Sequence, residues 1–375
     1  MSRIGIVGTG YIAKGILFAL GRTDDLEVTR VFTHSSPESR TDFPKRTLLT
    51  NSIEELVDAS DLVVVASGDP VRATEPVEAA IDASLPVVTM DAELQVTVGT
   101  HFCRRGYFTE AEGDQPGCLA ALREEALAMG FTPLVYGNLK GFLNHRPTLE
   151  EMRYWSGIQG ISLDKTTAFT DGTKVQIEQA LVANGLDAAI VQDGLLGPTA
   201  EDVASGGAAL ARIADERHQP ISDYLLGVPG APAGVFLTGR HEEEMQPYLR
   251  YYKMGDGPYY TLLRNYHLCH LEVAKTVRRA IEERPPLLNN GRSPTVQVVG
   301  VAKRDLAEGE VLRHPIGSFD VRGVAIRTAD HPEHVPIGLL DGARLTRPVP
   351  SDGTITLDDV ELVESRAVEI WRTIR

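Results

Sequence analysis

The sequence contains few cysteines, few aromatic residues and no excess of positive charge. Its three cysteines, Cys103, Cys118 and Cys269, are odd in number and lack CxxC spacing, so we expect reduced thiols and no disulfide framework. No uninterrupted apolar run is long enough for the core of a signal peptide or for a membrane span. The formal net charge of -15 argues against binding to nucleic acids or to anionic membranes. These absences predict a cytoplasmic protein with neither nucleic acid nor membrane as a partner.

The first part of the chain alternates short apolar segments with helical patterns. Strands are predicted at 4–7, 28–32, 62–66 and 86–90, and helices at 11–20 and 75–83. Strands that are apolar throughout and separated by helices indicate a parallel sheet covered on both faces. The predicted fold class is therefore α/β, with an N-terminal doubly wound parallel sheet of the Rossmann type.

The rest of the chain follows a different rhythm, with helical candidates at 119–129, 174–183 and 268–283 and then short strands and turns. A Pro/Asn/Gly-rich segment at 283–294 has the composition of a linker. Because 375 residues are too many for one core, we predict three domains. These are a dinucleotide-binding domain at 1–135, a central α+β substrate-binding and oligomerisation domain at 136–290, and a small β module at 295–375. The amount of apolar helical surface predicts a homo-oligomer, a dimer or a tetramer.

A glycine-rich loop, Gly8-Thr-Gly10-Tyr-Ile-Ala13, follows the first predicted strand and opens the first predicted helix. In that context Gly8 permits a tight turn and Gly10 lets the backbone approach a pyrophosphate, which Tyr11 and Ile12 meet at the helix N-terminus. Ser67 and Gly68, at the carboxyl end of another predicted strand, should line the same crevice. The alternative is a tight turn packed for structural reasons. The loop therefore predicts a nicotinamide dinucleotide as cofactor.

The end of the second predicted strand distinguishes the two forms of that cofactor. An acid there would accept the ribose 2′-hydroxyl of NAD, but the sequence has Thr33, Ser35 and, further on, Arg40. Hydroxyls and an arginine suit a 2′-phosphate better, so NADP is favoured over NAD. The alternative is a solvated loop whose residues bind nothing.

Lys174 is the first candidate for proton transfer. Thr173 and Gln176 form a capping-box pattern, which places Lys174 in the first turn of a helix. A cation beside the positive end of a helix dipole should have a lowered pKa, as a proton donor requires. Glu178, one turn on, could orient the ammonium, although a surface ion pair is the alternative. Lys140 is a second candidate, with a solvated loop lysine as its alternative.

Two polar segments further along the chain carry candidate ligands. His267, Cys269 and His270 lack the i, i+4 spacing of helical zinc histidines and no second cluster completes the ligand set, so we expect no metal. Buried packing or hydrogen bonding to a substrate is expected instead. In the second case His267 and Arg264 would hold a carboxylate or hydroxyls of the substrate.

Several short motifs in fixed order resemble the homoserine-dehydrogenase-like oxidoreductases that carry a C-terminal SAF (β-clip) domain. The motifs lie at 91–99, 113–117, 171–174, 183–184, 255–258, 302–310, 336–339 and 358–360. The resemblance implies that Lys174 handles the proton with Asp171 or Glu178 as helper, and that Lys140 is the second candidate. We expect Asp114 and Asn184, which lie in these motifs, to contact the substrate.

These patterns lead to one hypothesis and two rivals. The hypothesis is hydride transfer between the nicotinamide and a small polar carbonyl compound, homoserine-like or a hydroxy-acid or sugar-like aldehyde, with lysine as proton donor. The first rival is an epimerase, isomerase or lyase that oxidises its substrate only transiently. The second is a non-catalytic sensor, in which the C-terminal β module is the working surface and the dinucleotide only reports the redox state.

Overall fold

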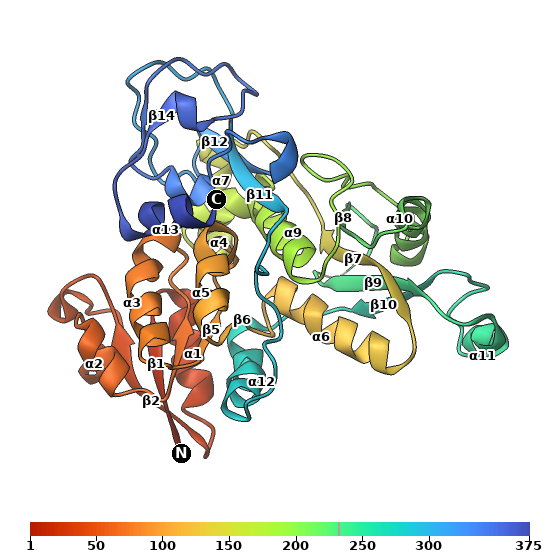
Figure 1. Ribbon diagram of the computed structural model, residues 1–375, viewed down its shortest axis with the longest axis horizontal. Helices are drawn as coiled ribbons and strands as arrows, with labels where there is room; N and C mark the ends of the chain where they lie inside the picture. Colours follow the sequence, from red (N-terminus) through yellow and green to blue (C-terminus); the bar gives the residue numbers. More distant parts are fainter. Residues whose placement is uncertain (232) are drawn as a thin grey trace. The chain divides into compact units, whose positions relative to one another are not determined.

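The computed structural model describes residues 1–231 and 233–375 (Figure 1). It divides into two compact units, which are described here one after the other. The first unit comprises residues 1–117, 268–294 and 362–375, and the second comprises residues 118–267 and 295–361. The expected domain boundaries do not coincide with these units, because each unit is assembled from segments that are distant in the sequence.

The first unit is built on a six-stranded sheet in the order β3-β2-β1-β4-β5-β6. Its strands are β1 (Ser2–Val7), β2 (Leu26–Phe32), β3 (Leu49–Thr50), β4 (Leu62–Val65), β5 (Val87–Thr89) and β6 (Phe108–Glu110). Every neighbouring pair is parallel. This is the doubly wound order in which the direction of winding reverses between β1 and β4. The predicted α/β class and parallel sheet are thereby confirmed.

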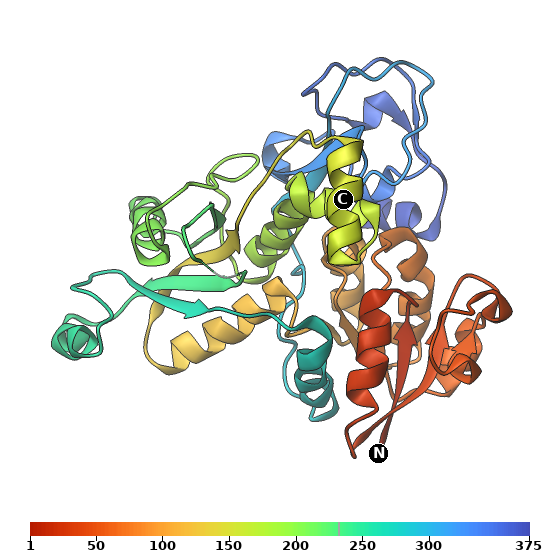
Figure 2. The same cartoon turned by 180° about the vertical axis from the view of Figure 1, so that it is seen from behind.

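Helices and a buried core cover this sheet. The helices are α1 (Tyr11–Leu20), α2 (Ile53–Asp58), α3 (Pro70–Asp82), α4 (Ala92–Leu94), a π-helical turn (Gln95–Gly99), α5 (Thr100–Arg105), α12 (Cys269–Ile281) and α13 (Arg366–Ile374). Short 3₁₀ turns lie at Pro37–Ser39 and Arg46–Leu48. Figures 1 and 2 show α12 beside α1, and Val273 and Val277 of α12 join Ile4, Ile6 and Ile16 in one core. The predicted helix at 268–283 therefore belongs to the first unit.

The segment after α12 is not the free linker that its composition suggested. The Glu110 backbone N–H donates to the Leu288 carbonyl at 2.6 Å, and the Leu287 N–H donates to Thr109 Oγ1 at 2.8 Å. The Asn290 N–H reaches Gln95 Oε1 at 3.3 Å. Proline, asparagine and glycine indicate the absence of a helix, but they leave the backbone able to pair with the edge of β6.

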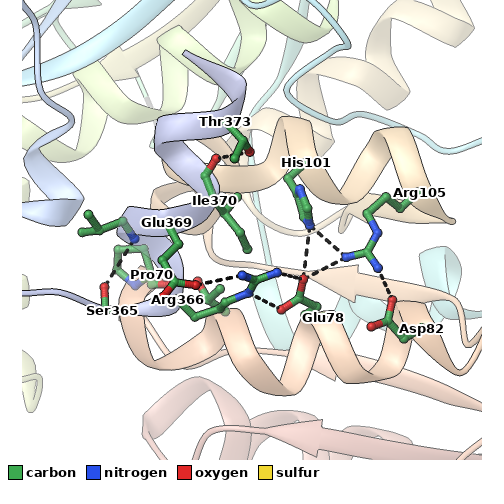
Figure 3. Close-up of polar contacts among 12 residues, drawn as sticks. Pro70, Glu78, Asp82, His101, Arg105, Ser365, Arg366, Glu369, Ile370 and Thr373 are labelled. Carbon is green, nitrogen blue, oxygen red and sulfur yellow. Dashed lines mark hydrogen bonds and ion pairs between the residues drawn. The ribbon is translucent and has the colours of Figure 1, made fainter.

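The last helix, α13, is held on the first unit by an arginine clamp (Figure 3). Two nitrogens of Arg366 bind the two carboxylate oxygens of Glu78 on α3, at 2.7 and 2.8 Å. Arg105 and His101 of α5 contact the same carboxylate, at 2.9 and 3.4 Å. The hydrogen bonds from Arg366 hold the pKa of Glu78 at about 2, below its ordinary 4.5. Beside the clamp, Trp371 and its apolar neighbours on α13 are buried.

The second unit contains a four-stranded mixed sheet in the order β10-β9-β7-β8. Its strands are β7 (Thr132–Lys140), β8 (Ile221–Leu226), β9 (Val235–Arg240) and β10 (Tyr260–Arg264). β7 runs parallel to β8 and antiparallel to β9. The sheet lies in the expected α+β region, but its strands are separated by long loops and helices, which hide it from a search for repeating βαβ units.

The helices of this part of the chain are α6 (Gln115–Ala128), which crosses from the first unit into the second, α7 (Leu149–Gln159), α8 (Leu163–Thr170), α9 (Thr173–Gly185), α10 (Val203–Arg217) and α11 (Gln246–Tyr251). A 3₁₀ turn precedes α11 at Glu243–Met245. α9 packs against β7 and β8 on one side and against β11 and β12 on another (Figure 1). Nearly all of its residues are therefore buried.

The remaining strands of the second unit are β11 (Val296–Ala302), β12 (Val321–Arg327), β13 (Arg344–Leu345) and β14 (Val360–Glu361). β11 pairs with β12 and β13 with β14, both antiparallel. Turns of 3₁₀ helix lie at Thr328–Asp330, Ile337–Leu339 and Leu357–Asp359. Among the residues that the structure describes, no helix combines the length and apolarity needed to cross a bilayer.

We expect Arg366→Ala to lower the free energy of unfolding at neutral pH by about 1–2 kcal/mol, since it leaves the half-buried Glu78 carboxylate without its strongest partner. A carboxyl whose folded-state pKa is depressed stabilises the fold above its ordinary pKa of 4.5, and this contribution is lost as the pH falls towards 2. The difference between wild type and variant should therefore narrow between pH 6 and pH 3 in urea unfolding. Arg372→Ala is the matched control and should change little, because it removes only an exposed pair between Arg372 of α13 and Glu364, which precedes the helix. A deficit independent of pH would contradict the assignment to Glu78.

Candidate functional site

The glycine loop lies where the carboxyl ends of β1 and β4 meet. Gly8 has a φ of +115°, and a Cβ there would lie 2.5 Å from the carbonyl oxygen of Ala66, so only glycine fits. Gly10 caps α1 with an ordinary φ of -76°. A Cβ at Gly10 would meet no described atom within 4 Å. The loop thus brings two strands together and leaves open space before the first turn of a helix.

The start of α1 fits a pyrophosphate. No described side chain caps its first turn, which begins at Tyr11 and Ile12. Unsatisfied backbone N–H groups and the positive end of the helix dipole attract anions at such a position. Ala13 is fully buried, which allows the helix to pack closely on the sheet. The residues at this loop therefore fit the nicotinamide dinucleotide that the sequence predicts.

The loop after β4 is held by a buried aspartate. Asp91 Oδ2 accepts hydrogen bonds from the Ser67 N–H, the Ser67 hydroxyl and the Gly68 N–H at 2.8, 2.7 and 2.9 Å. Burial and the neighbouring Glu93 raise the pKa of Asp91, whereas these hydrogen bonds act in the opposite direction. Ser67 and Gly68 thus lie beside the glycine loop as predicted, but their donors bind Asp91. The sequence signal for Asp91 was its position directly after a predicted buried strand.

The loop after β2 brings one predicted residue to the glycine loop. An Arg40 guanidinium nitrogen donates to the Thr9 carbonyl at 3.0 Å. Thr33 is buried and its hydroxyl accepts from the Ser35 N–H at 3.3 Å, while Ser35 itself is exposed. Arg40 also contacts Asp42, and this aspartate had not been singled out from the sequence.

In the second unit, Lys174 lies in the first turn of α9, as predicted, but the capping box is wrong. The cap is Gly172, with a φ of +87°. The Thr173 hydroxyl instead accepts from the Gly323 N–H at 2.8 Å, and Gln176 Oε1 accepts from the Ala325 N–H at 2.9 Å. Both side chains therefore bind backbone N–H groups of β12. A local sequence pattern cannot reveal these donors, because β12 lies far along the chain.

The predicted helper Asp171 has a different partner from the one implied. Its Oδ2 lies 2.6 Å from Lys303 Nζ, and its Oδ1 accepts from the Thr173 N–H at 2.9 Å. Asp171 and Lys303 are both buried. Burial raises the pKa of Asp171 and lowers that of Lys303, and each partner opposes that shift in the other. This pair fixes the α8–α9 turn beside the end of β11, and Lys303 was missed because it lies far along the chain.

Lys140 and Glu178, two of the predicted catalytic residues, lie together. Glu178 Oε2 accepts from Lys140 Nζ at 3.0 Å and from Asn138 Nδ2 at 2.9 Å. Glu178 is almost fully buried, and the Lys140 side chain is 14% exposed. The pair joins β7 to α9, so Lys140 is not the solvated loop lysine of the alternative interpretation.

The four predicted substrate residues are divided between the units. Asp114 lies buried in the first, in the turn where Gly113 packs against the Cys269 carbonyl. In the second, Asn184 Nδ2 donates to the Val296 carbonyl at 2.9 Å and its Oδ1 accepts from the Val296 N–H, which anchors β11. The Arg264 guanidinium lies 5.1 Å from the ring centre of Tyr266, and His267 is half-buried. A substrate role for these four residues stays a prediction.

No group of three or more histidine, cysteine or acidic side chains in the described ranges is placed to hold a metal ion.

One family model and several solved structures are similar to this chain. The family model of the catalytic domain of oxidoreductase DRL matches residues 113–273. A probable dehydrogenase from Thermotoga maritima is similar over 77% of this chain and 91% of its own, with 14% identity and a TM-score of 0.41. The myo-inositol dehydrogenase from Lactobacillus casei, solved with NAD(H) and myo-inositol, is similar over 76% of this chain and 88% of its own, with 12% identity and a TM-score of 0.41. No curated protein matches.

The family match supports an oxidoreductase, and hence an enzyme. It covers the segment that contains Lys140, Asp171, Lys174 and Glu178. The resemblance to homoserine-dehydrogenase-like enzymes and the SAF assignment stay predictions.

Alanine at the two loop glycines should separate folding from binding. Gly8→Ala should lower the free energy of unfolding by about 2 kcal/mol or more, because of its positive φ and the Ala66 carbonyl. Gly10→Ala should leave stability within about 0.5 kcal/mol, because its Cβ enters open space, yet should weaken dinucleotide binding by roughly tenfold or more. Thermal unfolding and calorimetric titration with NADP and NAD measure the two effects. Unchanged nucleotide affinity in a folded Gly10→Ala protein would sink the pyrophosphate assignment.

Proposed function

We propose that this protein is an NAD(P)-dependent oxidoreductase that transfers a hydride to or from a small polar carbonyl or hydroxy compound. The observation that carries the proposal is the glycine loop at the reversal point of the doubly wound sheet, where only glycine fits at residue 8 and the start of α1 faces open space. The oxidoreductase catalytic-domain match over residues 113–273 supports the reaction class independently.

The first unit holds the cofactor in this proposal. The backbone at Gly8, Gly10, Tyr11 and Ile12 binds the pyrophosphate, and Asp91 keeps the Ser67–Gly68 turn beside it. When bound, the nicotinamide supplies the hydride acceptor or donor. NADP is preferred over NAD because the loop after β2 presents Thr33, Ser35 and Arg40, with no acid directly at the strand end.

Lys174 is the proposed proton donor in the second unit. It occupies the first turn of α9, where the helix dipole disfavours its charged form and so eases release of its proton. The ammonium also stabilises negative charge that develops on a carbonyl oxygen during reduction. Lys140, held by Glu178 at 3.0 Å, is the second candidate for the same role. Homoserine-like, hydroxy-acid and sugar-like carbonyl compounds remain the proposed substrate classes, and homo-oligomerisation and a cytoplasmic location stay predictions.

Lys174→Ala should reduce kcat by roughly 10²- to 10⁴-fold while leaving the Kd for NADP within about twofold, because a proton donor acts on the reaction and not on nucleotide binding. The measurement is reduced-nicotinamide absorbance across a panel of hydroxy acids, sugar acids and their aldehydes. Lys165→Ala removes an exposed lysine of α8 and is the matched control.

Two outcomes of the same assay would redirect the proposal. Full turnover by Lys174→Ala would move the proton-donor role to Lys140, which Lys140→Ala then tests. Substrate conversion without net change in reduced nucleotide would identify the epimerase, isomerase or lyase class. Failure of the purified protein to bind either nucleotide would exclude the proposal altogether.

A further inference from the structure

The carboxylate of Asp42 lies between two cations near the glycine loop. Asp42 Oδ2 is 2.7 Å from Lys14 Nζ on α1, and Asp42 Oδ1 is 3.3 Å from Arg40 Nε on the loop after β2. Both oxygens of a single carboxylate are therefore engaged by positive charges. The cations come from different elements of the first unit and converge only through the fold.

Arg40 links this charge cluster to the dinucleotide loop. One terminal nitrogen donates to the carbonyl of Thr9, the middle residue of the Gly8–Gly10 turn, at 3.0 Å. Its Nε is buried and, among the described residues, has no hydrogen-bond partner, because the 3.3 Å contact with Asp42 lacks hydrogen-bond geometry. The guanidinium thus keeps donor capacity that Asp42 does not satisfy.

The three side chains differ in how firmly they are held. Lys14 and Arg40 are 29% and 28% exposed, whereas Asp42 is 57% exposed. The aspartate is therefore the member of the cluster that can leave at least cost. The hydrogen bond from Lys14 lowers the pKa of Asp42, so this residue is charged at neutral pH.

A phosphate monoester suits this pair of cations better than a carboxylate does. It carries close to two negative charges at neutral pH and presents three acceptor oxygens, so it can engage a lysine and an arginine at once. In a sheet of this order, the end of β2 is where the adenosine ribose of a dinucleotide is recognised. The cluster lies there, in contact with the loop that would hold the pyrophosphate.

We propose that Asp42 sets the choice between NADP and NAD: Lys14 and Arg40 hold the ribose 2′-phosphate, which must displace the Asp42 carboxylate from them. The inference rests on the proposed function and adds Lys14 and Asp42 to it. Asp42 acts as an internal competitor, so it lowers the affinity for NADP and leaves NAD binding unaffected.

A role for Asp42 as a ligand of NAD predicts a different result. If the Asp42 carboxylate instead accepted the ribose 2′-hydroxyl of NAD, its removal would weaken NAD binding. An internal competitor and a ribose ligand therefore shift the two affinities in different directions, and a single substitution separates them.

The test is calorimetric titration of the full chain with 2′,5′-ADP, which carries the 2′-phosphate, and with NADP and NAD. Asp42→Asn should bind 2′,5′-ADP and NADP roughly threefold to fivefold more tightly, the size of effect expected for one exposed charge pair, with NAD within about twofold. Lys14→Gln and Arg40→Gln should each weaken 2′,5′-ADP binding by about fivefold or more. The gain in Asp42→Asn should shrink at high salt, because these charges are partly exposed.

Asp61→Asn is the matched control. Asp61 is an exposed aspartate of the same unit, paired with Arg3 at 2.6 Å, and its removal should alter neither nucleotide affinity. Thermal unfolding of each variant checks that the fold is intact.

The outcomes distinguish this inference from the function on which it rests. Unchanged or weaker 2′,5′-ADP binding by Asp42→Asn, or a loss of NAD affinity, overturns the competitor role. If NAD binds while 2′,5′-ADP binds to none of the proteins, the inference fails and the proposed function stands. If no nucleotide binds to any of them, both fail.

Discussion

The close approach of two strand ends governs the architecture of the first unit. The backbone at Gly8 lies against the carbonyl of Ala66 with no room for a side chain, and its φ of +115° turns the chain directly into α1. This contact fixes the position of the loop after β1 relative to the loop after β4. Asp91 then ties the second loop to the end of β5 through three hydrogen bonds. A helix N-terminus facing open space follows from this geometry and not from any one binding residue.

In the second unit the main constraint is the burial of α9, a helix that is rich in polar side chains. Each described polar partner comes from another element: β7 and β8 for Gln179, Lys140 for Glu178, and β11 for Asn184. Buried polar groups stabilise a fold only when they are paired, and such networks specify one packing arrangement. Polar side chains of α9 therefore connect this helix to several strands by hydrogen bonds. Lys174 lies in the first turn of this helix.

Much of the fold could be predicted from the sequence because its signals are local. The apolar runs of β1, β2, β4 and β5 and the pattern of α1 lie within a few residues of their predicted positions. β3 and β6 have only two and three residues, too few for any periodicity. The glycine loop was also predictable, since each of its residues has a role set by adjacent backbone.

The parts of the candidate site that escaped prediction depend on distant residues. The Lys303–Asp171 pair joins positions that only the packing of β11 beside α9 brings together. Asp42 is an ordinary loop aspartate in the sequence and gains meaning only from Lys14 and Arg40. The Thr173–Gln176 pattern matched a capping box, but both side chains accept hydrogen bonds from backbone N–H groups of β12 instead. Where polar side chains are buried, their hydrogen-bond partners are set by tertiary contacts and differ from those that the local sequence pattern predicts.

The arginine clamp on α13 has a consequence for how the chain matures during synthesis. Glu78 emerges from the ribosome early, but its partner Arg366 follows only after the whole second unit has been made. The surface that α13 covers therefore lacks this helix while the second unit is being made, although all six strands of the first sheet lie before residue 111. Domains usually consolidate one after another as they are translated, whereas the first unit includes residues 362–375, which follow the second unit in the sequence. Until α13 has been made, the parts of α3, α5 and the π-helical turn against which it packs lack this helix.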